Sequence, residues 1–239
     1  MPAVSREGHL VSARDRLLGP APGTRIKICC MSSLEEVELA LEAGADALGL
    51  VSAMPSGAGI IGDDEAARIG RAIGDRAASV LLTSRQTAAA LVQQLEAFVP
   101  AVLQMVDDIT PADMAELRAR FPALILMPVI HVRSEASVEE ASAVSRLSDA
   151  ILLDSGNPGA AVKELGGTGR VHDWTLSREI CERVKQPVFL AGGLRPENVA
   201  KAIQQVRPHG VDVCSGVRRH GRLDRELLMR FVEAVRSTP

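Results

Sequence analysis

Short apolar runs alternate with helical patterns through most of the 239 residues, and this alternation constrains the fold more than any other feature. The runs predict strands at residues 25–29, 46–51, 77–83, 100–105, 124–130, 149–153, 187–190 and 210–214. The segments between them predict helices near residues 33–43, 63–73, 86–97, 111–120, 135–146, 175–185, 196–206 and 224–236. Strand–helix repeats with apolar strands are typical of a buried parallel sheet joined by right-handed crossovers.

Eight such units are the number that closes a (β/α)8 TIM barrel, a parallel eight-stranded barrel with outer helices, and the chain length fits one. A doubly wound open sheet is the alternative, because it uses the same alternation. We expect residues 23–239 to form a single barrel domain. Residues 1–22 precede the first strand and are predicted to be an N-terminal extension, either a flexible arm or an extra helix.

The composition argues against several classes of partner. Aromatic residues make up 2% of the chain, so the stacking platforms of a single-stranded nucleic-acid binder are not expected. The net charge of −3 is spread over mixed charges, which does not favour a polyanion or an anionic membrane as partner. The apolar runs are too short to span a membrane, and residues 1–20 do not resemble a secretory signal. We therefore expect a cytoplasmic protein.

The four cysteines, Cys29, Cys30, Cys181 and Cys214, have no metal-ligand spacing, so no metal is predicted. Vicinal Cys29 and Cys30 are not expected to bridge each other, because neighbouring side chains on a strand point to opposite faces. In a cytoplasmic protein the plain expectation is that all four remain thiols.

The strand ends are the place to look for chemistry, because TIM barrels carry their sites at the carboxyl ends of the strands. Cys29 ends the first predicted strand and Asp154 follows the sixth. A thiol base and a carboxylic acid around one mouth fit a proton-shuttling isomerisation. Lys27 lies on the same strand face as Cys29 and is expected to favour its thiolate. The plainer interpretations are a core cysteine and a turn-capping aspartate.

Small residues follow the last two strands: Gly192, Gly193, Ser215 and Gly216. Backbone N–H groups in such loops bind phosphate in many barrels, although glycines also make ordinary turns. A long glycine-rich connection, residues 155–174, follows Asp154 and predicts either a mobile lid or a tolerated surface insertion.

Several motifs together resemble one known family. They are "KIC" at residues 27–29, "EAGADALGLV", "LLDS", "GGTG" followed by "DW", "PVFLAGGLRPENV" and "VRPHGVDVCSGV". These segments resemble the phosphoribosylanthranilate isomerase family of tryptophan biosynthesis, from about residue 25 to the C-terminus. The resemblance implies a (β/α)8 barrel and an aldose–ketose isomerase that performs an Amadori rearrangement without a cofactor.

By this resemblance Cys29 is the general base that takes the proton from C2 of the ring-opened Schiff base. Asp154 is the general acid that protonates the ribose ring oxygen, and Asp212 helps to hold the site. The resemblance also assigns phosphate binding to Gly192, Gly193, Ser215 and Gly216, and the lid loop to Gly166, Gly167 and Gly169. The expected partner is a small phosphorylated substrate, and no oligomeric state is predicted.

The chain departs from the family pattern at three places. Cys30 replaces a usual glycine, Ala58 stands near the arginine expected to bind the anthranilate carboxylate, and Asp107 and Asp108 alter the end of the fourth strand. Arg68 and Arg85 are other candidates for the carboxylate. Two alternatives therefore stay open: a divergent paralogue acting on another phosphosugar adduct, and a non-catalytic barrel that binds a phosphorylated ligand.

Overall fold

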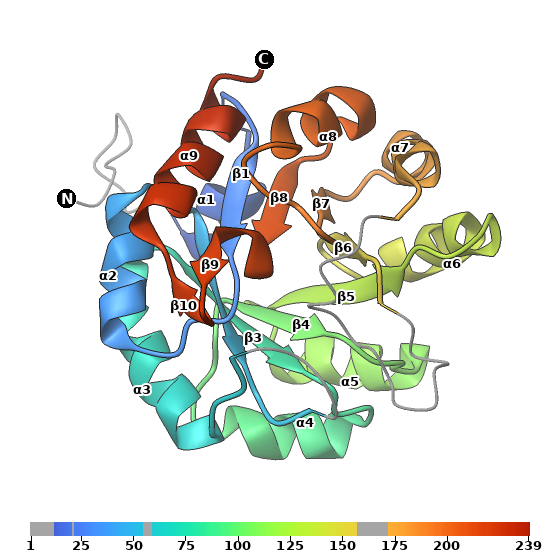
Figure 1. The fold of residues 1–239 in the computed structure, drawn as a ribbon. Coiled ribbons are helices and arrows are strands. Elements are labelled where there is room, and N and C mark those ends of the chain that lie inside the picture. The colour runs from blue at the N-terminus through green and yellow to red at the C-terminus, as the bar shows by residue number, and fades with distance from the viewer. Residues whose placement is uncertain (1–11, 21, 55–58, 157–171) are drawn as a thin grey trace, which may run out of the picture.

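Eight parallel strands form a closed barrel in the computed structural model, which describes residues 12–20, 22–54, 59–156 and 172–239 (Figure 1). The strands are β1 (Arg25–Ile28), β2 (Ala47–Val51), β3 (Ala78–Thr83), β4 (Val102–Met105), β5 (Ile125–His131), β6 (Ile151–Asp154), β7 (Val188–Leu190) and β8 (Gly210–Val213). Each strand pairs with the next along the chain, and β8 pairs with β1 to close the ring. The predicted TIM barrel is confirmed, and the open sheet is excluded.

Helices surround the barrel at the places predicted from the sequence. They are α2 (Leu34–Glu42), α3 (Asp63–Ile73), α4 (Ala88–Leu95), α5 (Pro111–Arg120), α6 (Ala136–Ser145), α7 (Trp174–Arg183), α8 (Val199–Val206) and α9 (Arg225–Arg236), with a 3-10 turn η1 (Gly74–Arg76) after α3. Side-chain caps define several starts: Ser33 accepts a hydrogen bond from the Glu36 N–H and Thr110 accepts one from the Asp113 N–H. No helix in the described ranges is long and apolar enough to cross a membrane.

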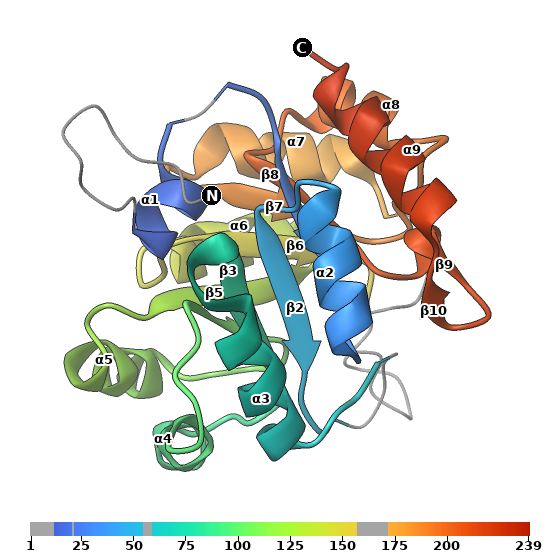
Figure 2. The same ribbon diagram turned by 90° about the vertical axis from the view of Figure 1, so that its left-hand side faces the viewer.

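An extra helix, α1 (Ala13–Leu18), lies at the amino-terminal ends of the strands, on the far side from a hairpin of β9 (Arg218–Arg219) and β10 (Arg222–Leu223) (Figure 2). Leu17 is fully buried there, and its carbonyl oxygen lies 2.8 Å from Nε2 of His209, just before β8. Of the two forms expected for the extension, residues 13–18 thus adopt the helix. Helix α1 therefore lies at the end of the barrel opposite the carboxyl ends of the strands, where TIM barrels carry their sites. The domain boundary at residue 22 stays a prediction.

The barrel interior changes from apolar to polar toward the carboxyl ends of the strands. Alternate strand residues face inward, and an apolar cluster of such residues includes Ala47, Ala78, Val80, Val102, Ile125, Met127, Leu152 and Phe189. Phe189, the one aromatic residue of this described cluster, fills space left by Gly210, where any Cβ would overlap the ring. Nearer the carboxyl ends of the strands, the inward-facing positions are occupied by buried polar residues: Lys27, Cys29, His131, Asp154 and Asp212.

The segment after β8 contains structure that the sequence did not predict. A 3-10 turn, η2 (Ser215–Val217), leads into a two-stranded hairpin, β9 (Arg218–Arg219) and β10 (Arg222–Leu223), before α9 begins. The hairpin lies beside the loop that follows β1.

Candidate active site

Cys29 lies directly after β1 with its side chain facing the barrel interior. Its backbone N–H donates to the carbonyl oxygen of Val213 at 2.8 Å, and only 5% of the residue is exposed. Its sulfur packs against Gly49 on β2, since a Cβ built at Gly49 would sit 2.8 Å from Sγ. Two neighbouring strands therefore fix the position of the thiol.

A buried ion pair lies on the same strand face as Cys29. Lys27 is fully buried, and its Nζ donates to Oδ1 of Asp212 at 2.9 Å. Burial raises the pKa of the Cys29 thiol to about 11, although Lys27 opposes this shift. The expected Lys27 neighbour is present and acts in the expected direction, but the thiolate that we expected it to favour is not the resting form. Desolvation outweighs the ammonium charge, so Cys29 is a neutral thiol at neutral pH.

Replacing Lys27 by methionine is expected to destabilise the protein by about 3–5 kcal/mol, because it leaves the buried Asp212 carboxylate without a partner. Urea unfolding followed by circular dichroism measures this change. The paired variant Lys27→Met/Asp212→Leu removes both charges and should recover most of the loss. A single variant within 1 kcal/mol of the parent would contradict the pairing.

Asp154 ends β6, and it is buried and faces the same interior. Burial raises the pKa of its carboxyl above the ordinary value, while the Ser155 backbone N–H, 2.7 Å from Oδ1, partly opposes the shift. A raised pKa is the property that a carboxyl group needs to act as a general acid near neutral pH. The register pairs Asp154 with His131 on β5.

His131 is a candidate that the sequence analysis missed. Its Nε2 lies 3.1 Å from the carbonyl oxygen of Val106, which requires the proton on that nitrogen in the neutral ring. Nδ1 then carries a lone pair, and it is buried without a hydrogen-bond partner among the described residues. The predicted strand ended one residue too early, at 130; extending it by one residue and applying the inward parity would have found this side chain.

The loops after β7 and β8 meet at one place. Gly192 and Gly193 have positive φ values of 84° and 63°, and a Cβ at Gly216 would overlap the Leu194 carbonyl oxygen. Ser215 and Gly216 begin η2. None of these four backbone N–H groups donates a hydrogen bond to any of the described residues. All four are therefore available to an anion.

The remaining expectations concern Ala58, the lid glycines and the two alternative arginines. Ala58 and the lid glycines Gly166, Gly167 and Gly169 lie outside the described residues. The two alternative arginines are engaged elsewhere: Arg68 with Glu65 at 2.6 Å, and Arg85 with Asp63 at 2.9 Å. Each guanidinium group therefore already pairs with a carboxylate of the protein.

A disulfide joins Cys30 to Cys214, which corrects the expectation that all four cysteines remain thiols. The two Cα atoms lie 6.1 Å apart, although the residues are 184 positions apart in sequence. Cys29 and Cys181 are free. Cys214 immediately precedes Ser215, so the bond ties the loop after β1 to the loop that carries the N–H groups of Ser215 and Gly216.

Opening this disulfide is expected to lower the free energy of unfolding by about 2–4 kcal/mol, since it constrains a very long loop of the unfolded chain. The Cys30→Ser variant, unfolded in urea without reductant, measures the effect. The matched control is Cys181→Ser, which removes a free, half-buried thiol. Equal stability of parent and Cys30→Ser, with the bond shown intact in the parent by mass spectrometry, would refute the expectation.

Comparison with known proteins gives a consistent result. The family model "N-(5'phosphoribosyl)anthranilate (PRA) isomerase" matches residues 26–234. A protein of Methanocella arvoryzae named N-(5'-phosphoribosyl)anthranilate isomerase is 36% identical over 216 residues, which cover 90% of this chain and 99% of the relative.

Solved structures agree. The phosphoribosyl anthranilate isomerase of Thermotoga maritima aligns with a TM-score of 0.76 and 28% identity, over 89% of this chain and 98% of that one. The isomerase structure in complex with reduced 1-(o-carboxyphenylamino)-1-deoxyribulose 5-phosphate aligns with a TM-score of 0.73 and 26% identity, over 89% and 98% of the two chains. The chain therefore belongs to the N-(5'-phosphoribosyl)anthranilate isomerase family.

Proposed function

We propose that this chain converts N-(5'-phosphoribosyl)anthranilate into 1-(o-carboxyphenylamino)-1-deoxyribulose 5-phosphate, a step of tryptophan biosynthesis, with Cys29 as general base and Asp154 as general acid. The observation that carries the assignment is the placement of these two groups. Both lie at the carboxyl ends of strands, both face the interior of one barrel mouth, and burial raises the pKa of each. A chain of this family with that geometry has what acid–base isomerisation needs.

The reaction balances with proton transfers alone. Asp154 gives a proton to the ribose ring oxygen, the bond from C1 to that oxygen breaks, and the nitrogen lone pair forms the C1=N bond of the Schiff base. Cys29 then takes the proton from C2, the electrons of that C–H bond form C1=C2, and the electron pair of the C1=N bond returns to nitrogen. The 2-hydroxyl loses a proton and C1 gains one, which leaves the ketone. The sum is an isomerisation in which no electron leaves the substrate.

The phosphate group of the substrate is proposed to bind at the loops after β7 and β8. The free N–H groups of Gly192, Gly193, Ser215 and Gly216 supply partial positive charge without a cationic side chain. Gly216 permits this arrangement, since any larger residue would push the two loops apart. Such a site holds the phosphate end while the sugar carbons reach Cys29 and Asp154. An anionic substrate of this kind is retained inside a cell, so we propose a cytoplasmic location.

The direct test is the loss of N-(5'-phosphoribosyl)anthranilate fluorescence on addition of the purified chain. Saturable turnover at a rate proportional to protein concentration is the expected result. Circular dichroism shows whether the sample is folded. A folded sample that leaves the fluorescence unchanged would refute the proposed substrate, and the segment around Ala58 would then be the first place to search for another.

A further inference from the structure

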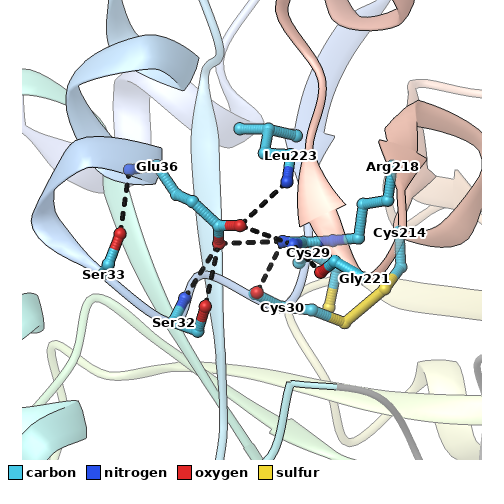
Figure 3. Close-up of polar contacts among 9 residues, drawn as sticks. All are labelled: Cys29, Cys30, Ser32, Ser33, Glu36, Cys214, Arg218, Gly221 and Leu223. Atoms are coloured by element: carbon cyan, nitrogen blue, oxygen red, sulfur yellow. Dashed lines mark hydrogen bonds and ion pairs between the residues drawn. A yellow bond between two sulfur atoms is a disulfide. The ribbon is translucent and has the colours of Figure 1, made fainter.

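A buried arginine–glutamate pair lies behind the loop that carries Cys29 (Figure 3). The side chains of Arg218 and Glu36 are only 7% and 11% exposed. Nη1 of Arg218 donates to Oε1 of Glu36 at 2.7 Å, and Nη2 donates to Oε2 at 3.1 Å. Two parallel bonds of this kind give the pair both strength and a fixed orientation. Although burial opposes it, Arg218 and the Leu223 N–H hold the pKa of Glu36 below its usual value, so the pair is charged at neutral pH.

The guanidinium group also holds the backbone of the proposed base. Nη2 of Arg218 donates to the carbonyl oxygens of Cys30 at 2.6 Å and Cys29 at 3.3 Å. From the other side, Glu36 accepts hydrogen bonds from the backbone N–H and the hydroxyl of Ser32, at 3.1 and 3.2 Å. Figure 3 shows these contacts converging on the turn that follows β1. In residues 29–32, two carbonyl oxygens, those of Cys29 and Cys30, and the N–H of Ser32 are thereby held in place.

This turn needs external support. Cys30 has a φ of +69°, a left-handed conformation that costs a residue with a Cβ free energy and persists only where neighbours enforce it. A Cys29 carbonyl that shifts carries its side chain with it. A displacement of about 1 Å of a catalytic group typically lowers the rate about 100-fold.

The same pair reaches the phosphate side of the site. Arg218 directly follows η2, and its Nη1 donates to the Gly221 carbonyl oxygen at 3.0 Å, while Glu36 accepts from the Leu223 N–H at 2.9 Å. The hairpin that begins where the proposed phosphate turn ends is thus joined to the turn of the base. We propose that Arg218 and Glu36 form a clamp that positions Cys29 relative to the bound phosphate, an inference that rests on the proposed function.

The effect of the clamp on the position of Cys29 can be distinguished from an effect on substrate binding. Ser215 and Gly216 are also held by the close backbone contact between Gly216 and Leu194, which does not involve Arg218. Loss of the clamp should therefore leave phosphate binding largely intact while the sulfur loses its position. The Cys30–Cys214 disulfide joins the same two loops, so the test is made in dithiothreitol, where this second tie is open.

The test compares Arg218→Met, Arg218→Lys, Glu36→Gln and the double variant Arg218→Met/Glu36→Gln, with kcat and KM measured separately on protein shown to be folded. The control is Arg118→Met, an arginine that likewise pairs with a buried carboxylate, Asp149, and with the Leu124 carbonyl oxygen, but at the amino-terminal end of the barrel. Lysine at 218 keeps the charge but cannot form the parallel bonds, so it should recover only part of the rate.

The clamp predicts that kcat of Arg218→Met falls about 10- to 100-fold with KM within about threefold. The double variant should lose no more than the worse single variant, because both residues act as one unit. Arg118→Met should keep the parent kcat. A kcat of folded Arg218→Met within twofold of the parent, while Cys29→Ala abolishes turnover, would overturn the clamp alone. Additive losses would overturn it as well, and no turnover by the parent chain would overturn both the clamp and the proposed function.

Discussion

Replacing Cys29 by alanine is expected to lower kcat about 1,000- to 10,000-fold, which is the upper part of the range for removal of a general base. Alanine leaves no group on β1 that can take the C2 proton. KM should change little, because the phosphate contacts are proposed to come from the loops after β7 and β8. Steady-state kinetics on N-(5'-phosphoribosyl)anthranilate measures both constants.

The variant Gly49→Ala provides a second test of the same thiol. A methyl group at residue 49 would lie 2.8 Å from Sγ of Cys29, closer than Cβ contacts normally come. The sulfur must move, so kcat should fall although Cys29 is still present. If Cys29→Ala instead retained a tenth or more of the parent kcat, another group would be the base. Nδ1 of His131, which has no hydrogen-bond partner in the part of the chain that the structure describes, would be the first candidate.

The fold was predictable because each barrel unit repeats the same local signals. All eight strands and all eight outer helices lie within a few residues of their predicted positions, since apolar runs, helix caps and periodicity are local properties. The candidate acid and base followed from one further rule, the strand-end position. Their inward direction in the structure agrees with the period-2 alternation of β1 and β6.

The features that the sequence did not predict depend on contacts between residues far apart in the chain and on how deeply a side chain is buried. Cys30 and Cys214 are 184 residues apart, and no spacing rule relates them. Arg218 and Glu36 meet across a similar separation. Likewise, the pattern of β1 places Lys27 near Cys29, but it does not reveal how completely the strand is buried. That burial reverses the expected direction of the thiol pKa shift.

The raised pKa of Cys29 has a consequence for the proposed mechanism. The proposed mechanism requires the thiolate of Cys29 together with the protonated carboxyl of Asp154. The pKa of Cys29 is about 11, and burial also raises the pKa of the Asp154 carboxyl. Between these two pKa values, the major form of the site has Cys29 as a neutral thiol and Asp154 as a carboxylate. In the active form the proton lies on Asp154 instead of Cys29. Both forms carry the same number of protons, so the ratio of the active form to the major form does not depend on pH. The parent kcat/KM should therefore be level between the two pKa values.

Asp154→Asn is expected to lower kcat about 100- to 10,000-fold and to change this pH profile. With the carboxyl absent, only the thiolate fraction of Cys29 depends on pH, so residual kcat/KM should rise about tenfold per pH unit toward pH 11. In Cys29→Ala the residual rate should instead fall with pH above the pKa of Asp154, because only its protonated form is then required. Level profiles in both variants would contradict the two assignments.

Stability measurements separate this loss of activity from unfolding. The folded-state pKa of Asp154 is raised, so between the unfolded and folded pKa values the folded state binds more protons than the unfolded state. The free energy of unfolding therefore falls as the pH rises through that window, and the cost remains at neutral pH. Asparagine keeps the shape and an acceptor for the Ser155 N–H but carries no charge. Asp154→Asn should thus unfold at a higher urea concentration than the parent at pH 7 while it has lost most activity. A variant that is both inactive and less stable would assign Asp154 to structural support rather than to proton transfer.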